Sequence, residues 1–354
     1  MSAPYFTVLI DSYNYGHYVE EAVSSVLAQD FPKGEREILV VDDGSTDDTA
    51  SRLRRLGNAI RYLRKPNGGQ ASAFNYGFEH ARGEVVALLD ADDVWLPGKL
   101  RRVQEEFQRN PRAGMVYHRL YWWDGADEVG ADRYFAGVSG RVPESRRALL
   151  EYPMASTSCL AFRRAAVEKL LPVPEVLRSQ ADAYLTALTI FVAPVAAVGE
   201  YLGKYRLHGT NLFQTAGKQF SREKIEHRIA MRGTLLAEIE NWLEKEGRDT
   251  KSKDLRSYLK QWKKAQEQDG FLLEAPGRWK YFRHLFGLPW TYGEIMMGRH
   301  RIYSYLRAYA ALVLGYHHLY LFDEARRKRK EWMASSSEKT VVAVKAKAAA
   351  ATKS

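Results

Sequence analysis

The most constraining feature of the sequence is a short apolar run that ends abruptly in carboxylates. Residues 85–89 (VVALL) are all apolar, and Asp90, Asp92 and Asp93 follow within four positions. A short apolar run bounded by polar residues is typical of a strand that is covered on both faces. Carboxylates at the carboxyl end of a parallel strand lie where open α/β sheets bind ligands. The stretch therefore indicates either a site for a hard divalent cation or a solvated acidic turn in which Asp93 caps the next helix.

The chain before this run alternates between two periodicities. Short apolar runs predict strands, and apolar residues spaced three and four apart predict helices. The predicted strands are 6–10, 37–41, 60–63 and 85–89, and the predicted helices are 19–27 and 71–81. Strands that alternate with helices imply an α/β fold in which a mostly parallel sheet is built by right-handed crossovers and flanked by helices.

A second strand of this sheet also ends in acid, because Asp42 and Asp43 follow the run at 37–41. Ser45 or Thr46 is expected to cap the helix that comes next, with two further aspartates in its first turn. Two acidic strand ends on the same edge of a sheet are hard to explain by solvation alone. They favour a site for a nucleotide, whose base or ribose would face one pair and whose diphosphate would face a metal.

The segment Asn67-Gly68-Gly69-Gln70 precedes the predicted helix at 71–81. Its glycines allow a close approach of the backbone to a ligand, and an ordinary turn is the alternative. The sequence lacks the glycine-rich fingerprints of dinucleotide-binding folds and P-loops after its predicted strands.

Composition limits the class of protein. With 354 residues, 45% of them hydrophobic and 27% charged, the chain is globular and large enough for a sizeable core. The net charge of +10 suits nucleotides, nucleic acid or an anionic membrane. The positive charge is scattered and late, with no recognised module, so we expect no nucleic-acid partner. One cysteine excludes an internal disulfide framework, and the N-terminus shows no secretory pattern, so we expect a cytoplasmic protein.

Four segments within the first 95 residues resemble, in order, the nucleotide-sugar half of family 2 glycosyltransferases, which are inverting enzymes of the GT-A fold. They are Asp11-Ser12-Tyr13-Asn14, the segment from Asp42 to Asp47, the segment from Asn67 to Gly77, and Asp90-Ala91-Asp92-Asp93. Two positions depart from the family pattern. Asp11 stands where many members have proline, and Phe74 stands where many have arginine.

The resemblance implies a role for each matching residue. Residues expected at the donor nucleotide are Asp11, Ser12, Tyr13, Asp42, Asp43, Asn67, Gly69, Gln70, Asn75, Asp90 and Ala91. Among them, Asp43 would accept a hydrogen bond from the base, and Asp90 would contact the ribose or the metal region. Asp92 would bind the metal, and oxygen ligands of this kind suit Mg²⁺ or Mn²⁺.

The resemblance also implies a catalytic base later in the chain. Residues 175–185 match the Glu-Asp segment of the family, whose aspartate is the general base. Here Ala181 replaces the first acid and Asp182 remains, and the alternative is that Asp182 only caps a helix at 183–191. Residues 204–208 (KYRLH) resemble the segment that closes the catalytic domain, so His208 would approach the metal and Arg206 a phosphate.

The middle of the chain contains less specific signals. We expect a helix at 96–107, an interrupted strand or hairpin at 115–123, and a strand at 158–162 that leads into a helix near Arg163. We expect His118 to be structural and Cys159 to be a small buried hydrophobic residue.

The last third is rich in helical, charged and aromatic residues. Amphipathic helices are predicted at 218–245 and 254–268, followed by an aromatic and basic stretch at 276–286. The apolar run at 309–322 is too short to span a bilayer. Two interpretations stay open: helices that lie in an anionic membrane interface, or a helical subdomain that packs on the catalytic domain. Residues from 334 onward have the composition of a disordered tail.

These observations predict a catalytic domain at 1–212, divided into a nucleotide-sugar half (1–95) and an acceptor half (96–212). A helical region would follow at 213–333 and a disordered tail at 334–354. The implied activity is metal-assisted, inverting transfer of a sugar, UDP-linked, to a saccharide or lipid-linked acceptor in polysaccharide or glycolipid synthesis. The alternative is an inactive nucleotide-sugar-binding or membrane-peripheral scaffold, which the alanine at position 181 supports. A nucleotidyltransferase is less favoured, because its glycine-rich, basic N-terminal phosphate loop is missing.

Overall fold

The computed structural model describes residues 3–131, 155–209, 221–274 and 277–286, together with a few single positions up to residue 318. The tail predicted at 334–354 and most of the apolar run at 309–322 lie outside the described residues. No described helix combines the length and the apolar character that a membrane span requires.

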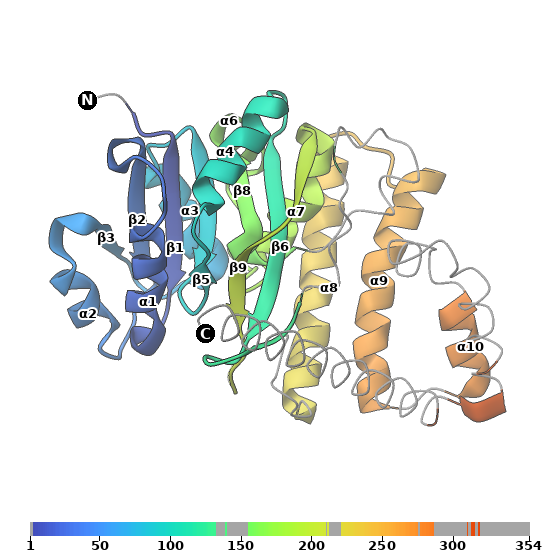
Figure 1. Ribbon diagram of the computed structural model, residues 1–354. Coiled ribbons are helices and arrows are strands. Elements are labelled where there is room, and N and C mark those ends of the chain that lie inside the picture. The colour runs from blue at the N-terminus through green and yellow to red at the C-terminus, as the bar shows by residue number, and fades with distance from the viewer. Residues whose placement is uncertain are drawn as a thin grey trace, which may run out of the picture.

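The first half of the chain forms the parallel part of a nine-stranded sheet, as Figure 1 shows. Its strands are β1 (Phe6–Ser12), β2 (Arg36–Asp42), β3 (Arg61–Arg64) and β4 (Val85–Asp90), in the spatial order β3-β2-β1-β4. Neighbours in this group are all parallel. The connecting helices are α1 (Gly16–Leu27), α2 (Thr49–Arg55) and α3 (Gln70–His80), with 3-10 turns η1 (Lys33–Glu35) and η2 (Gly57–Ala59). The predicted alternation of strand and helix is confirmed.

The second half extends the same sheet with strands of both directions. These strands are β5 (Val94–Trp95), β6 (Met115–Trp123), β7 (Glu128–Ala131), β8 (Leu160–Arg163) and β9 (Val195–Arg206). Strand β8 is antiparallel to both β4 and β6, whereas β9 runs parallel to β6. The stretch predicted as interrupted is one strand, β6, whose pairing with β9 shifts register near residues 118–120. The strand predicted at 158–162 begins later, because residues 157–159 form a 3-10 turn, η3 (Thr157–Cys159).

Helices cover both faces of the sheet and enclose two hydrophobic cores. Helices α1 and α4 (Lys99–Arg109) pack on one face, and α3 and α7 (Ala181–Val192) pack on the other. The short α6 (Arg164–Val167) and η4 (Glu168–Leu170) connect β8 to the loop before α7. Phe74 is fully buried in the core beneath α3. Its ring therefore belongs to the hydrophobic core, at a position where many members of the resembled family have arginine.

Two predicted helix caps are wrong. Helix α2 begins only at Thr49, because Ser45 Oγ instead accepts a hydrogen bond from Asn14 N at 2.9 Å and keeps the loop extended. Asp47 Oδ1 accepts from Thr49 N at 3.0 Å and serves the start of the helix in their place. Asp93 caps no helix, because a turn in which Gly98 has φ +84° delays the start of α4 to Lys99.

The C-terminal helices α8 (Arg222–Lys245) and α9 (Lys253–Leu273) stand beside α7 in Figure 1, and α10 (Arg278–Phe286) lies beyond them. Leu235 and Ile239 of α8 are fully buried in the same core as α7. Tyr258 of α9 donates a hydrogen bond from Oη to Ala187 O at 2.9 Å. This packing supports the interpretation of α8 and α9 as a helical subdomain that rests on the catalytic domain.

Candidate active site

Three carboxylates stand in a row at the carboxyl edge of the parallel strands. Asp11 at the end of β1 is in register with Asp90 at the end of β4. Asp43, one residue after β2, donates its backbone N–H to Ser12 O at 2.9 Å and so continues the pairing with β1. The residues two positions earlier, which share the same face of a strand, are buried in the core under α3 and α7: Leu9, Val41 and Leu88. The alternation of side chains therefore directs all three carboxylates toward the side of the sheet that α3 and α7 cover.

Beside this row, Asp90, Asp92 and Asp93 form an acidic cluster, in which each offers a carboxylate oxygen within 4.8 Å of the others. Burial, followed by the charges of nearby aspartates, raises the pKa of both Asp90 and Asp93. Three carboxylates this close repel each other unless they share protons or a cation. An oxygen-rich donor set of this kind fits a hard divalent ion such as Mg²⁺ or Mn²⁺.

The members of the cluster have different surroundings. Asp93 is fully buried and accepts hydrogen bonds from Ser158 Oγ at 2.6 Å and from Arg206 N at 2.8 Å. Asp92 Oδ2 lies 2.8 Å from Nε2 of His208, whose ring stacks on Tyr18 with centroids 5.4 Å apart. The structure thus places Asp92 beside His208, the two residues predicted as metal ligands. Asp93 is buried in the same cluster and is held by its own hydrogen bonds.

Arg206 holds the segment that carries Asp92. Its Nε donates to Asp92 O at 2.7 Å and its Nη2 to Glu21 Oε2 at 2.5 Å. The guanidinium also stacks on Trp123, 4.1 Å from the ring centroid. Arg206 is therefore next to the acidic cluster.

The two aspartates at the carboxyl end of β2 make different contacts. Asp42 is fully buried, and accepts from Ser45 N at 2.8 Å and from Tyr62 Oη at 2.7 Å, which ties β2 to β3. The carboxylate of Asp43 accepts several hydrogen bonds from the loop before α3. It accepts from Lys65 Nζ at 2.7 Å, and its other partners are Asn67 Nδ2 at 3.0 Å, Gly68 N at 2.9 Å and Gly69 N at 2.6 Å. The loop predicted at the donor is thus built around Asp43.

The same loop is joined to the start of α7. Gln70 N donates to Arg178 O at 2.8 Å, and Gln70 Oε1 accepts from Ala181 N at 2.9 Å. Gly69 has φ +86°, and a Cβ added there would meet Arg178 Cα at 2.6 Å. Asn67 Oδ1 also accepts from the Arg178 guanidinium. The side chain of Gln70 therefore satisfies an orphan N–H at the first turn of α7.

Asp182 lies in that first turn, and the N-cap position belongs to Gln180, so Asp182 is not a conventional cap. Its Oδ2 accepts from Thr157 Oγ1 at 3.0 Å and its Oδ1 from Ala183 N at 2.7 Å. Burial raises the pKa of Asp182, although these two hydrogen bonds oppose the shift. The side chain is thus held in one orientation and is more basic than an ordinary aspartate, as a general base requires.

The end of β1 carries polar atoms without partners. Among the described residues, neither Oδ1 of Asp11 nor Oγ of Ser12 has a hydrogen-bond partner, although both atoms are buried. Burial, and then the charges of Asp182, Asp92 and Asp43, raises the pKa of Asp11 to about 7. The next residue, Tyr13, is 45% exposed and leaves its ring open to solvent. Unpaired buried polar atoms are uncommon, and at a strand end they mark a place where a ligand can bind.

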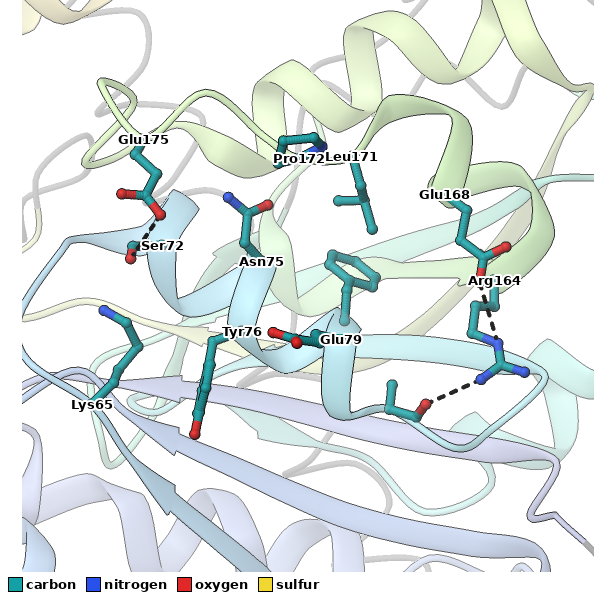
Figure 2. A pocket seen from close by; sticks show the side chains of 12 residues that line it. Lys65, Ser72, Asn75, Tyr76, Glu79, Arg164, Glu168, Leu171, Pro172 and Glu175 are labelled. Carbon is teal, nitrogen blue, oxygen red and sulfur yellow. Dashed lines mark hydrogen bonds and ion pairs between the residues drawn. The ribbon is translucent and has the colours of Figure 1, made fainter.

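Two residues predicted at the donor nucleotide, Ala91 and Asn75, belong neither to the row of carboxylates nor to the acidic cluster. Ala91 is buried beneath the acidic cluster. Asn75 exchanges two hydrogen bonds with the backbone of Val173, both at 2.8 Å, and lines a groove of about 560 Å³ between α3 and residues 164–175 (Figure 2). The groove starts at Lys65 and Ser72, behind the loop at 67–70. Asn75 thus ties α3 to the segment that leads into α7.

The sequence reasoning missed the support beneath the site. Ser158 Oγ accepts from Asp90 N at 3.0 Å and donates to Asp93, and its carbonyl accepts from Lys99 Nζ at 2.8 Å and from Trp95 Nε1 at 3.0 Å. Lys99 is fully buried, its ammonium lies 3.3 Å from the centroid of Trp95, and burial lowers its pKa. A lysine in the first turn of an amphipathic helix gives no sign of such burial. The prediction of a buried Cys159 is confirmed, and His118 is fully buried.

Comparison with known sequences gives one family. The sequence profile described as Glycosyl transferase family 2 matches residues 7–171. An uncharacterized glycosyltransferase of Nostoc sp. is 35% identical over 238 residues, which span 64% of this chain and 72% of the relative. An uncharacterized glycosyltransferase of Rickettsia typhi is 28% identical over 221 residues, or 61% of this chain and 68% of the relative.

Solved structures show the same fold. Residues 1–349 of Staphylococcus aureus TarS, in complex with UDP-GlcNAc, match with a TM-score of 0.59 and 20% identity, over 93% of this chain and 92% of that one. The mannosyltransferase PcManGT from Pyrobaculum calidifontis, in complex with GDP-Man and Mn²⁺, matches with a TM-score of 0.51 and 21% identity, over 91% and 84% of the two chains. At these identities the likeness concerns the fold, and the predicted GT-A-type architecture is confirmed.

Proposed function

Because this chain belongs to the family 2 glycosyltransferases, we propose that it transfers a sugar from a nucleotide-sugar to a hydroxyl acceptor. The donor is UDP-linked, and the acceptor is a saccharide or a lipid-linked saccharide in polysaccharide or glycolipid synthesis. The observation that carries the proposal is the convergence of the acidic cluster, the row of carboxylates and the oriented Asp182 at one edge of the sheet. The UDP-GlcNAc of the TarS complex supports a UDP-linked donor.

The acidic cluster would hold Mg²⁺ or Mn²⁺ through Asp92, with His208 and Asp90 beside it. The Mn²⁺ of the PcManGT complex supports this choice of ion. When bound, the ion would neutralise charge that develops on the leaving nucleoside diphosphate. Arg206 N and Ser158 Oγ hold Asp93, and this keeps the cluster in place without occupying Asp92 or Asp90.

Asp182 would act as the general base. The acceptor hydroxyl loses its proton to Asp182 as its oxygen bonds to the anomeric carbon, and the bond from that carbon to the diphosphate oxygen breaks. Attack from the side opposite the diphosphate inverts the anomeric centre. The hydrogen bond from Thr157 and the raised pKa of Asp182 support this role, because they fix the carboxylate and strengthen it as a base.

The loops after β1, β2 and β3 would bind the donor nucleotide. Ser12 and Tyr13 line the pocket, where the exposed ring of Tyr13 can stack on the base. Asp43 accepts from the base, which then replaces one of its present partners in the loop at 67–70. Asp90 faces the ribose or the metal, and Arg206 faces a phosphate.

The helix α10 would attach the enzyme to an anionic membrane surface, on the cytoplasmic face where such lipids attract basic segments. Trp279 is 62% exposed and stacks on Phe282 with centroids 5.2 Å apart. Arg278, Lys280 and Arg283 on the same helix are exposed as well. Exposed aromatic rings flanked by cations suit the interface between lipid headgroups and acyl chains.

Release of nucleoside diphosphate from UDP-glucose, UDP-GlcNAc and GDP-mannose, measured with and without Mn²⁺, tests the activity. We expect Asp92→Asn to abolish binding that depends on Mn²⁺. Asp182→Asn should keep donor binding but lower turnover at least about 100-fold, because general-base catalysis contributes about 10²–10⁴-fold. Asp30→Asn serves as the matched control, since Asp30 is exposed and pairs only with the exposed Arg101 in the described part of the chain. If the parent protein binds no nucleotide-sugar with Mn²⁺, the proposal fails. Binding without transfer to any hydroxyl acceptor would instead favour the scaffold.

A further inference from the structure

The carboxylate of Asp11 occupies the middle of the row at the carboxyl edge of the sheet. On one side it is in register with Asp90, which belongs to the acidic cluster, and on the other side β2 carries Asp43. Adjacent strands are about 4.8 Å apart, so Asp11 lies about one strand spacing from Asp90. On the β2 side Asp11 is in register with Val41, and Asp43 follows two residues later on the same face. The acidic cluster itself consists of Asp90, Asp92 and Asp93, and Asp11 is not among its members in the described part of the chain.

Asp11 differs from Asp43, Asp92 and Asp93 because its Oδ1 atom has no hydrogen-bond partner in the described structure. Asp43 has partners on both oxygens, Asp93 has two hydrogen bonds, and Asp92 is paired with His208. Oδ1 of Asp11 is buried and has no hydrogen-bond partner among the described residues. A buried carboxylate oxygen without a donor reduces the stability of the fold. Such an oxygen points to a bound ligand that supplies the missing hydrogen-bond donor.

The chemistry of the row limits which group of the ligand can donate a hydrogen bond to Asp11. A carboxylate accepts hydrogen bonds and offers none when ionised. A phosphate is excluded, because it has no hydrogen to donate and would add negative charge beside the aspartates of the row. The diphosphate belongs at the acidic cluster on one side of Asp11, and the base belongs at Asp43 on the other. The parts of a nucleotide-sugar that remain are neutral and rich in hydroxyl groups.

We propose that Asp11 selects the donor by accepting a hydrogen bond from one of its hydroxyl groups, on the ribose or on the transferred sugar. This inference rests on the proposed function, since it assumes a nucleotide-sugar in the site. Asp11 is then a specificity residue, and a donor that lacks the hydroxyl leaves the buried oxygen unpaired again. A site built to pair with a substrate hydroxyl rejects analogues without it far better than an apolar pocket can.

Calorimetric titration with Mn²⁺ present tests the proposal on the full chain. The ligands are UDP, 2′-deoxy-UDP, 3′-deoxy-UDP and UDP-GlcNAc, with the guanosine counterparts in parallel. The proteins are the parent, Asp11→Asn, Asp11→Ala and the control Asp30→Asn. Hydrogen bonds to charged groups are worth about 10- to 100-fold in affinity. Thermal unfolding of each ligand-free protein is the second measurement.

We expect one of two patterns. If the hydroxyl is on the ribose, Asp11→Ala loses about 10- to 100-fold in affinity for UDP and no longer distinguishes UDP from one deoxy form. If it is on the transferred sugar, UDP affinity is unchanged and the additional affinity for UDP-GlcNAc is lost. In both cases Asp11→Asn raises the Tm, because it removes a buried unpaired carboxylate, whereas a residue with a purely structural role would lower it.

Unchanged affinities for every ligand in Asp11→Ala would overturn the proposal, and so would tighter binding of all ligands, which would show that Asp11 acts only by repulsion. A lower Tm in Asp11→Asn would overturn it as well. If the parent protein binds none of these nucleotides, the proposed function itself fails, and the inference fails with it.

Discussion

Replacement of Gly69 by alanine tests how tightly the donor loop is joined to the helix that carries Asp182. Gly69 has φ +86° and ψ 178°, a region of backbone space that glycine adopts almost alone. A Cβ at this position would lie 2.6 Å from Arg178 Cα and 2.7 Å from Arg178 O. Both are backbone atoms, so rotation of a side chain cannot relieve the overlap.

The magnitude follows from two contributions. Holding a non-glycine residue in this conformation costs about 1–3 kcal/mol. Relief of the overlap separates the loop from residue 178 and breaks the hydrogen bonds from Gln70 N to Arg178 O and from Ala71 N to Leu177 O. At about 0.5–1.5 kcal/mol each, these add about 1–3 kcal/mol. We therefore expect Gly69→Ala to lower the free energy of unfolding by about 2–6 kcal/mol and to weaken binding of UDP in the presence of Mn²⁺.

Urea unfolding of Gly69→Ala and Gly57→Ala measures the difference. Gly57 also has a positive φ, +51°, but a Cβ there would meet no atom within 4 Å. Its replacement should cost only about 1–2 kcal/mol, the usual penalty for a left-handed conformation, and should leave UDP binding unchanged. If Gly69→Ala is no more destabilising than Gly57→Ala, the close approach of the loop to residue 178 does not hold the site together.

Three further outcomes are expected. Burial raises the pKa of Asp11 from 3.8 to about 7, so between these values the folded protein retains a proton that the unfolded chain has lost. The free energy of unfolding without ligand should therefore fall as the pH rises from about 4 to about 7, and urea titrations should show a smaller fall in Asp11→Asn. The raised pKa of Asp182 means that kcat/KM should rise with pH, with a midpoint above the ordinary aspartate value of about 3.9, and a midpoint at or below that value would contradict its role as the base. Sedimentation with vesicles should show binding to anionic but not to neutral lipid, reduced several-fold by Trp279→Ala but not by the control Val129→Ala; equal binding of all proteins to both vesicles would remove the membrane from the proposal.

Regular hydrophobic patterns predicted most of the donor half, because β1, β2 and β4 contain continuous apolar runs and α1 and α3 each have an apolar face. The strand at 85–89 and its acidic end are in place, as are α1 and α3. The matches of short motifs in the right order then identified the family. Such patterns are local, and local signals suffice where a strand and its following helix form one unit of the fold.

The sequence could not show which polar groups pair with one another across the fold. Asp93 looked like a helix cap, but its partners Ser158 and Arg206 are 65 and 113 positions away. Gln70 caps α7 from 111 positions away, and no local rule connects the two segments. The burial of Lys99 has the same origin, because its hydrogen-bond acceptor, the carbonyl of Ser158, belongs to the η3 turn 59 positions later in the chain. Pairings at this separation are set by the completed sheet.

The joint between the loop at 67–70 and the start of α7 has a consequence for engineering. A chimaera that exchanged residues 1–95 with those of a relative, to change the donor, would separate Gln70 and Gly69 from the segment at 177–181 against which they fit. The boundary between the two halves of the sequence is therefore not a boundary in the structure. A functional exchange would need to transfer the segment at 177–181 together with the first 95 residues, so that the new loop arrives with its own complementary surface.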